Sequence, residues 1–377
     1  MTRARVGLLV ILVAVADRPA RAQSLDGWQV SVDFLQIHTR GNDVHVGDVF
    51  TERQTLTGTA SDSRLDYGVR YDPIVTAMDA NRSVMVTAVY RNAGWGAGAR
   101  GWRSRTEGSA AGSRRTAAPT ISSLTVTGVR MWDNSIVPVV NTAEPSGISP
   151  VTFEAENSLQ NLRLEGFAER LWIQGDTLTV AARFGVAHAR LENDRREQQT
   201  QEAFVEEANG GTITTFENDV RLEGTSETTA NLTGPLLALA GDTRVKRLRI
   251  DWLIGHAVLL GTAETSGEWI DIDDIRTITL AGGLPVESFE LLNGIIEKSQ
   301  DDRALVPVLD LQVKASVRVT PFLSLGGGVF SSTWFNLPVA PAFSIPDDWT
   351  DVQGTAWRQQ TRDVTFLALS VFAGFGF

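Results

Sequence analysis

The chain has 377 residues, a formal net charge of −11 at pH 7 and no cysteine. An acidic chain of this kind lacks the basic face that nucleic-acid binding needs, so nucleic acid is not expected as a partner. The absence of cysteine excludes disulfides, thiolate nucleophiles and Cys-ligated zinc, so stability must come from packing and hydrogen bonding.

Residues 1–22 have the pattern of an export signal. Arg3 and Arg5 precede an apolar run over 6–16, and Ala20-Arg21-Ala22 offers the small-x-small pattern of a cleavage site. The run is too short for a membrane-spanning helix, which needs about 20 residues. Removal of four Arg and one Asp with this segment would change the net charge from −11 to −14. We therefore expect residues 23–377 to form the mature, exported protein.

The N-terminal half of the expected mature chain alternates apolar and polar residues, as strands exposed on two different faces do. An opening strand is predicted over 28–37, followed by a hairpin whose strands cover 84–90 and 95–99, with a turn at 92–94. The glycines of Gly94-x-Gly96-x-Gly98 fall inside this alternation instead of opening a helix, which excludes a dinucleotide-binding loop.

Three more hairpins repeat the design, each with turn residues between two alternating segments. Their strands and turns are predicted at 162–168 and 178–186 around 174–176, at 232–239 and 248–254 around 241–243, and at 305–319 and 323–329 around Thr320-Pro321.

The last strand, from Thr365, carries Leu, Val, Ala and Phe at odd positions up to Phe377, while the even positions become small towards the end. A soluble protein rarely finishes on such a strand. The ending resembles the assembly signal of Gram-negative outer-membrane β-barrels, in which the assembly machinery recognises a terminal aromatic strand. The resemblance gives that role to Val371, Phe375 and Phe377.

The spacing of the connections predicts the fold class. Four short joins alternate with five long segments, as periplasmic turns alternate with extracellular loops in outer-membrane barrels. We expect an all-β, transmembrane, antiparallel up-and-down barrel of ten strands, or twelve if 65–71 and 121–131 also enter the wall. The loops are expected at about 39–81, 104–156, 192–230, 262–303 and 332–362. The 192–230 and 262–303 segments each carry ten acidic and three basic residues, which is typical of solvated surface.

The strand phases predict which charged side chains face the lumen, because a charge facing lipid costs about 2–4 kcal/mol at the bilayer midplane. The twelve candidates are Asp33, Arg91, Arg100, Arg163, Glu165, Glu169, Arg183, Arg249, Asp251, Asp310, Lys314 and Arg318. They could filter solutes in a polar channel, or pair into a network that fills a narrow barrel. Ten or twelve strands fall between the filled barrels of about eight strands and the open pores of 16–18, so both alternatives stay open.

Other sites have weaker support. His188 and His256 fall in the outward phase near the outer membrane interface, where a lipid-modifying enzyme would place its histidine, although girdle residues there look the same. Asp271, Asp273 and Asp274 could hold a hard cation but lack the rest of a calcium loop. We expect no enzyme activity, no metal and no cofactor.

Two local expectations concern the segments between strands. The spacing of Phe289, Leu292, Ile295 and Ile296 predicts a short helix over 286–298. Trp28, Trp95, Trp172 and Trp252 fall near strand ends, as interfacial tryptophans do, whereas Trp334, Trp349 and Trp357 are expected to pack within the last outer loop.

The overall pattern resembles porin-like, pore-forming outer-membrane proteins of Gram-negative bacteria, the Legionella-type major outer-membrane family among them. The resemblance implies passive diffusion of small solutes, and it implies outer-membrane lipids, lipopolysaccharide and the barrel assembly machinery as partners. A non-conducting structural or adhesive barrel is the alternative, and an outer-membrane lipid-modifying enzyme is a third.

Overall fold

The computed structural model describes residues 27–59, 62–114, 123–131, 134–136, 151–175, 177–209, 212–281, 284–341 and 360–376. The expected signal peptide, Trp349, Trp357 and Phe377 lie outside these ranges. No helix in the described ranges is long and apolar enough to cross a membrane.

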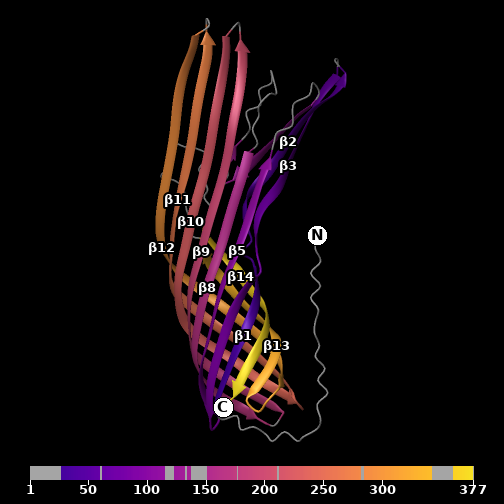
Figure 1. Ribbon diagram of the computed structural model, residues 1–377, viewed down its shortest axis with the longest axis vertical. Coiled ribbons are helices and arrows are strands. Elements are labelled where there is room, and N and C mark those ends of the chain that lie inside the picture. Colours follow the sequence, from indigo (N-terminus) through magenta and orange to yellow (C-terminus); the bar gives the residue numbers. More distant parts are fainter. Residues whose placement is uncertain are drawn as a thin grey trace.

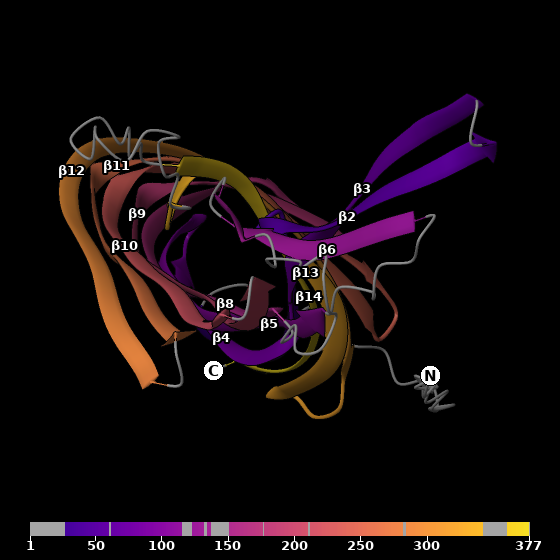
Figure 2. The same ribbon diagram turned by 90° about the horizontal axis from the view of Figure 1, so that it is seen from above.

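Ten antiparallel strands of the described chain close into a barrel, in which β1 pairs with both β14 and β4 and so joins the two ends of the sheet (Figures 1 and 2). In order around the wall they are β1 (Gly27–Arg40), β4 (Asn81–Asn92), β5 (Trp95–Arg114), β8 (Val151–Gln174), β9 (Leu178–Asn209), β10 (Thr212–Val245), β11 (Leu248–Ala281), β12 (Leu284–Arg318), β13 (Leu323–Val339) and β14 (Gln360–Gly376). The sequence allowed either ten or twelve wall strands, and the described wall contains ten.

The two segments that would have raised the count lie outside the wall. They belong to β3 (Asp62–Met78) and β6 (Ser123–Met131), which flank β2 (Val44–Thr59), and the short β7 (Asn134–Ile136) pairs with β6. This small sheet projects from one side of the barrel (Figure 2). Within the described residues its only strand pairing with the wall is between the end of β3 and β5.

Two of the five expected loops, 192–230 and 262–303, are extensions of the wall strands in their described residues. β9, β10, β11 and β12 contain 32 to 35 residues each, whereas about 9–11 suffice to cross a bilayer. The surplus rises above the barrel as tall hairpins (Figure 1). We call this the hairpin end, and the opposite end, where the short connections lie, the turn end.

The helix predicted over 286–298 is wrong, because the segment is part of β12 and pairs residue by residue with β11. Spacing that suits a helix was overridden by the long antiparallel ladder, which offers every backbone group a partner. The turn predicted at 241–243 is also displaced. The ladder between β10 and β11 continues to Val245–Leu248, and the chain reverses at Lys246 and Arg247, with Lys246 at a positive φ of 55°.

The outer face of the wall is a continuous apolar band. Ile254, for example, lies between Leu239 and Leu311 in register, and its side chain is 52% exposed. Aromatic side chains border the band at the turn end, where Trp28, Trp95 and Trp172 are about half exposed or more. An apolar band with an aromatic border is the surface that contacts lipid in outer-membrane barrels.

Ile254→Arg is expected to lower the free energy of unfolding by about 2–4 kcal/mol, the cost of an arginine at the bilayer midplane. The measurement is urea unfolding of the barrel in lipid vesicles, followed by Trp fluorescence. Thr229→Arg is the control. Thr229 lies nearer the hairpin end, in register between Glu192 and Glu264, whose carboxylates would pair with the new arginine. Equal effects of the two substitutions would contradict the assignment of the band to lipid.

Candidate functional site

The structure places all twelve predicted lumen residues on the inner face of the wall. Eight of them are buried, namely Asp33, Arg91, Arg100, Arg163, Glu165, Glu169, Asp310 and Lys314. Arg183, Arg249 and Asp251 are half-buried nearer the turn end, and Arg318 is exposed at its rim.

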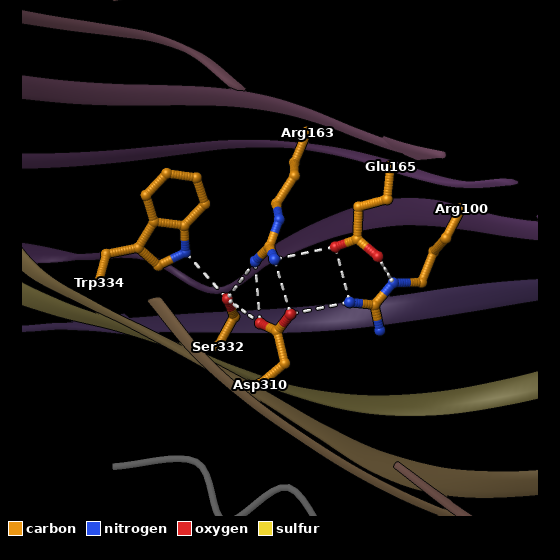
Figure 3. A network of polar contacts seen from close by, with 6 residues as sticks. All are labelled: Arg100, Arg163, Glu165, Asp310, Ser332 and Trp334. Carbon is orange, nitrogen blue, oxygen red and sulfur yellow. Dashed lines mark hydrogen bonds and ion pairs between the residues drawn. The ribbon is translucent and has the colours of Figure 1, made fainter. Parts of the chain in front are cut away.

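The centre of the lumen holds two arginines and two carboxylates in one network (Figure 3). Arg100 on β5 donates to both oxygens of Glu165 on β8, at 2.8 and 2.7 Å, and to Asp310 on β12 at 2.8 Å. Arg163 on β8 contacts both oxygens of Asp310, at 2.9 and 2.8 Å, and reaches Glu165 at 2.9 Å. The four charges sum to zero, which is what the burial of ions in a medium of low polarity requires.

The network joins opposite sides of the barrel. β5 and β12 are five places apart in the ring of ten, so the bond between Arg100 and Asp310 crosses the full width of the lumen. Arg163 is completely buried. The mid-lumen is therefore filled by side chains that hold each other in place.

An aromatic layer lies against the network. Trp334 on β13 donates from Nε1 to the Ser332 hydroxyl at 2.9 Å, and Ser332 donates to Asp310 at 2.6 Å. The Arg163 guanidinium lies 5.5 Å from the Trp334 ring. Trp102 makes edge contacts with Phe330 and Phe366, at centroid distances of 5.5 and 5.4 Å, and all four aromatic side chains are buried.

Two smaller networks lie nearer the turn end. Glu169 accepts hydrogen bonds from Arg91 and, at 2.9 Å, from Arg183, while the Lys314 ammonium lies 2.6 and 2.7 Å from the two Asp33 oxygens. Glycine makes room for them, because a Cβ at Gly96 would lie 2.8 Å from the Glu169 side chain.

On the hairpin side of the aromatic layer, asparagines form hydrogen bonds across the lumen. Asn157 donates to the carbonyl of Asn42, Asn193 donates to the Asn157 side chain at 2.9 Å, and the backbone N–H of Ala340 donates to Asn193 at 2.7 Å. Ser226 donates to the carbonyl of Pro341 at 2.9 Å. The chain just after β13 thus turns inward and reaches β9 and β10 across the lumen.

Several of these residues were missed or misplaced by the sequence analysis. Trp334 was expected in the last outer loop, but it is buried in the lumen. The asparagines carry no charge to mark them. Asp242 was read as a turn residue, yet it lies on the inner face and accepts from Arg244 at 2.8 Å and Arg249 at 3.4 Å. The signal that could have found Asp242 is its phase, two residues from Ala240 on the inner face.

The histidines lie on the outer surface. His188 hydrogen-bonds Thr233 across the strand pair at 2.9 Å, and His256 is exposed between Leu237 and Leu309 in register. Within the described residues no group of three His, Asp or Glu side chains could hold a metal ion. Asp271, Asp273 and Asp274 lie on β11, and their side chains are outside what the structure describes.

Comparisons with known proteins show no family for this chain. No family model matches it, and no curated protein does. Similar solved structures are outer-membrane β-barrels. The outer membrane protease OmpT from Escherichia coli is 9% identical, with coverage of 95% of this chain and 99% of that one and a TM-score of 0.43. The toluene transporter TodX of Pseudomonas putida is 9% identical, with coverage of 93% and 90% and a TM-score of 0.22.

An anion-selective porin from Comamonas acidovorans is also similar, at 9% identity, with coverage of 92% and 100% and a TM-score of 0.13. At these identities and TM-scores, nothing about function follows from the likenesses. The narrower resemblance to the Legionella-type family is not confirmed.

Proposed function

We propose that the protein is an outer-membrane barrel with a closed lumen, which anchors its tall hairpins at the cell surface as a structural or adhesive platform. The observation that carries the proposal is the bond between Arg100 and Asp310, which joins opposite strands through a fully buried, charge-neutral network. Two further layers lie on its hairpin side, one aromatic and one of asparagines. A solute crossing the barrel would have to displace the ionic and aromatic layers, whose side chains fill the centre of the lumen.

The outer surface supports the placement in a membrane. The apolar band would contact the outer-membrane lipids and lipopolysaccharide, with the turn end in the periplasm and the hairpin end outside. Val371 and Phe375 point outward from β14, at 69% and 39% exposed, where the assembly machinery could read them. The role of Phe377 rests on the sequence pattern alone.

The hairpin end offers a surface for contact outside the cell. A cavity of about 1130 Å³ lies there, lined by seven acidic side chains and three arginines. Glu156, Glu227 and Glu268 are among the acids that line it. Charged side chains at this end suit contact with water outside the membrane. The apolar barrel wall would anchor the protein in the membrane.

The proposal gives the protein no catalytic role. Among the described histidines, His188 is bonded to Thr233 and His256 is flanked by leucines, so neither contacts a carboxylate that would orient it. We expect that the wild type, His188→Ala and His256→Ala all leave phospholipid and lipid A chemically unmodified.

The wild-type barrel is expected to give no stepwise conductance in planar bilayers at 1 M KCl. A porin of known conductance, reconstituted in parallel, shows that insertion would be seen, and heat-dependent migration on SDS gels shows that the sample is folded. Ohmic steps that scale with the amount of folded barrel would overturn the closed lumen and favour passive diffusion of small solutes.

A further inference from the structure

The turn end of the barrel encloses a basic vestibule, a cavity of about 1390 Å³ below the central network. Nine cationic and two acidic side chains line it, in a protein with a net charge of −11. The cationic residues are Arg91, Arg100, Arg183, Arg244, Lys246, Arg247, Arg249, Lys314 and Arg318, and the acidic ones are Asp242 and Asp251.

Acidic partners neutralise only part of this charge. Arg91 and Arg183 share the single carboxylate of Glu169. At the rim, Lys246 and Arg318 form no ion pair with a described residue. The charged neighbours of Arg318 are Arg244 and Arg249, which are positive as well. The vestibule therefore keeps a positive field that counter-ions from the solvent would be drawn into.

Two buried donors in its wall have no acceptor among the described residues. Arg100 donates from Nε and Nη2 to the central network, but its Nη1 is buried and has no hydrogen-bond partner among the described residues (Figure 3). The Nε2 of Gln312 is likewise buried and has no hydrogen-bond partner among the described residues, and both side chains line the vestibule. A buried N–H without an acceptor is costly, so an oxygen-rich ligand would satisfy what the protein leaves open.

We infer that the vestibule binds a dissolved multivalent oxyanion, of the phosphate or polycarboxylate class, that enters from the turn end. Arg100 and Gln312 would donate to it at the inner end. Arg318 lies at the rim, about 20 Å along β12 from Gln312 by the rise of a strand, so Arg318 and Lys246 would draw the anion in by their charge without contacting it. Guanidinium groups suit such ligands because their paired N–H groups match two oxygens at once. The cavity lies inside the wall and not on its lipid face, which favours a dissolved ion over the headgroup of a membrane lipid.

The test is calorimetric titration of the folded barrel, in zwitterionic micelles at low salt, with inorganic pyrophosphate. We expect saturable binding by the wild type. Lys246→Gln with Arg318→Gln should weaken it about tenfold, because together they remove two positive charges that attract a multivalent anion at low salt. Neither residue has a described ion-pair partner, so the fold should be unaffected.

Arg105→Gln with Arg196→Gln is the matched control. It removes two half-exposed arginines from the hairpin end and lowers the net charge equally. Absence of saturable binding by the wild type, or equal weakening in the two double variants, would overturn the inference. Gln312→Leu gives a second check, since loss of an inner donor should weaken binding without changing any charge.

Nanodiscs distinguish the two sources of the same chemistry. Affinity for pyrophosphate that is equal with and without phosphatidylglycerol supports a dissolved ion, whereas competition by phosphatidylglycerol overturns that source and assigns the oxyanion to a lipid headgroup. The binding measurement does not depend on conductance, so a conducting wild type would overturn the closed lumen and leave this site standing.

Discussion

Asp310→Ala is expected to lower the free energy of unfolding by about 3–5 kcal/mol, because it leaves two buried arginines to share one carboxylate. Asp310 accepts from Arg100, Arg163 and Ser332, and its own side chain is inaccessible to solvent. The measurement is urea unfolding in vesicles, followed by Trp fluorescence. Of the substitutions considered, this one should destabilise the barrel most.

Asp301→Ala is the control, because Asp301 lies on the same strand but is exposed. The double variant Arg163→Ala with Asp310→Ala should be less destabilised than the sum of the two single variants, since it removes one charge of each sign and leaves Arg100 paired with Glu165. An Asp310→Ala effect no larger than that of Asp301→Ala would show that the network does not hold the barrel together.

Strand direction and facing could be predicted from the sequence because the two faces of the wall meet different surroundings. Ile254 points to lipid and Asp310 to the lumen, and alternation with a period of two records that difference in each strand. The same logic placed the twelve charged residues on the inner face, from their phase alone.

The sequence could not predict which of these residues meet. Arg100 and Asp310 are 210 positions apart, and their contact depends on the relative height of strands on opposite sides of the ring. Height follows from the stagger of the hydrogen-bond register, which no local pattern encodes. The choice between a filter and a filled lumen depended on that information.

Polarity was a poor guide to where strands end. The acidic segments over 192–230 and 262–303 were read as loops, yet their described residues continue the ladders of β9 to β12. Beyond the membrane, both faces of a hairpin can be solvated, so charges no longer conflict with strand structure. The turn at Lys246 was missed for a similar reason, since Gly241 and Asp242 carry the stronger turn chemistry.

Opening the lumen should take the removal of both central layers together. Arg163→Ser with Asp310→Ser empties much of the ionic layer without leaving an unpaired charge, and Trp334→Ala empties part of the aromatic layer. Each alone should stay non-conducting, because the other layer still fills the lumen. The triple variant is expected to show conductance steps in planar bilayers, which the wild type lacks.

Leu369→Ala with Val371→Ala, two lipid-facing truncations on β14, is the control for nonspecific leakage from a loosened barrel. Heat-dependent migration must show that the triple variant is folded before its conductance is read. A folded triple variant that still carries no current would contradict the assignment of the seal to these two layers. The barrier would then lie with the segment that follows β13, where Ala340 and Pro341 are hydrogen-bonded to the far wall.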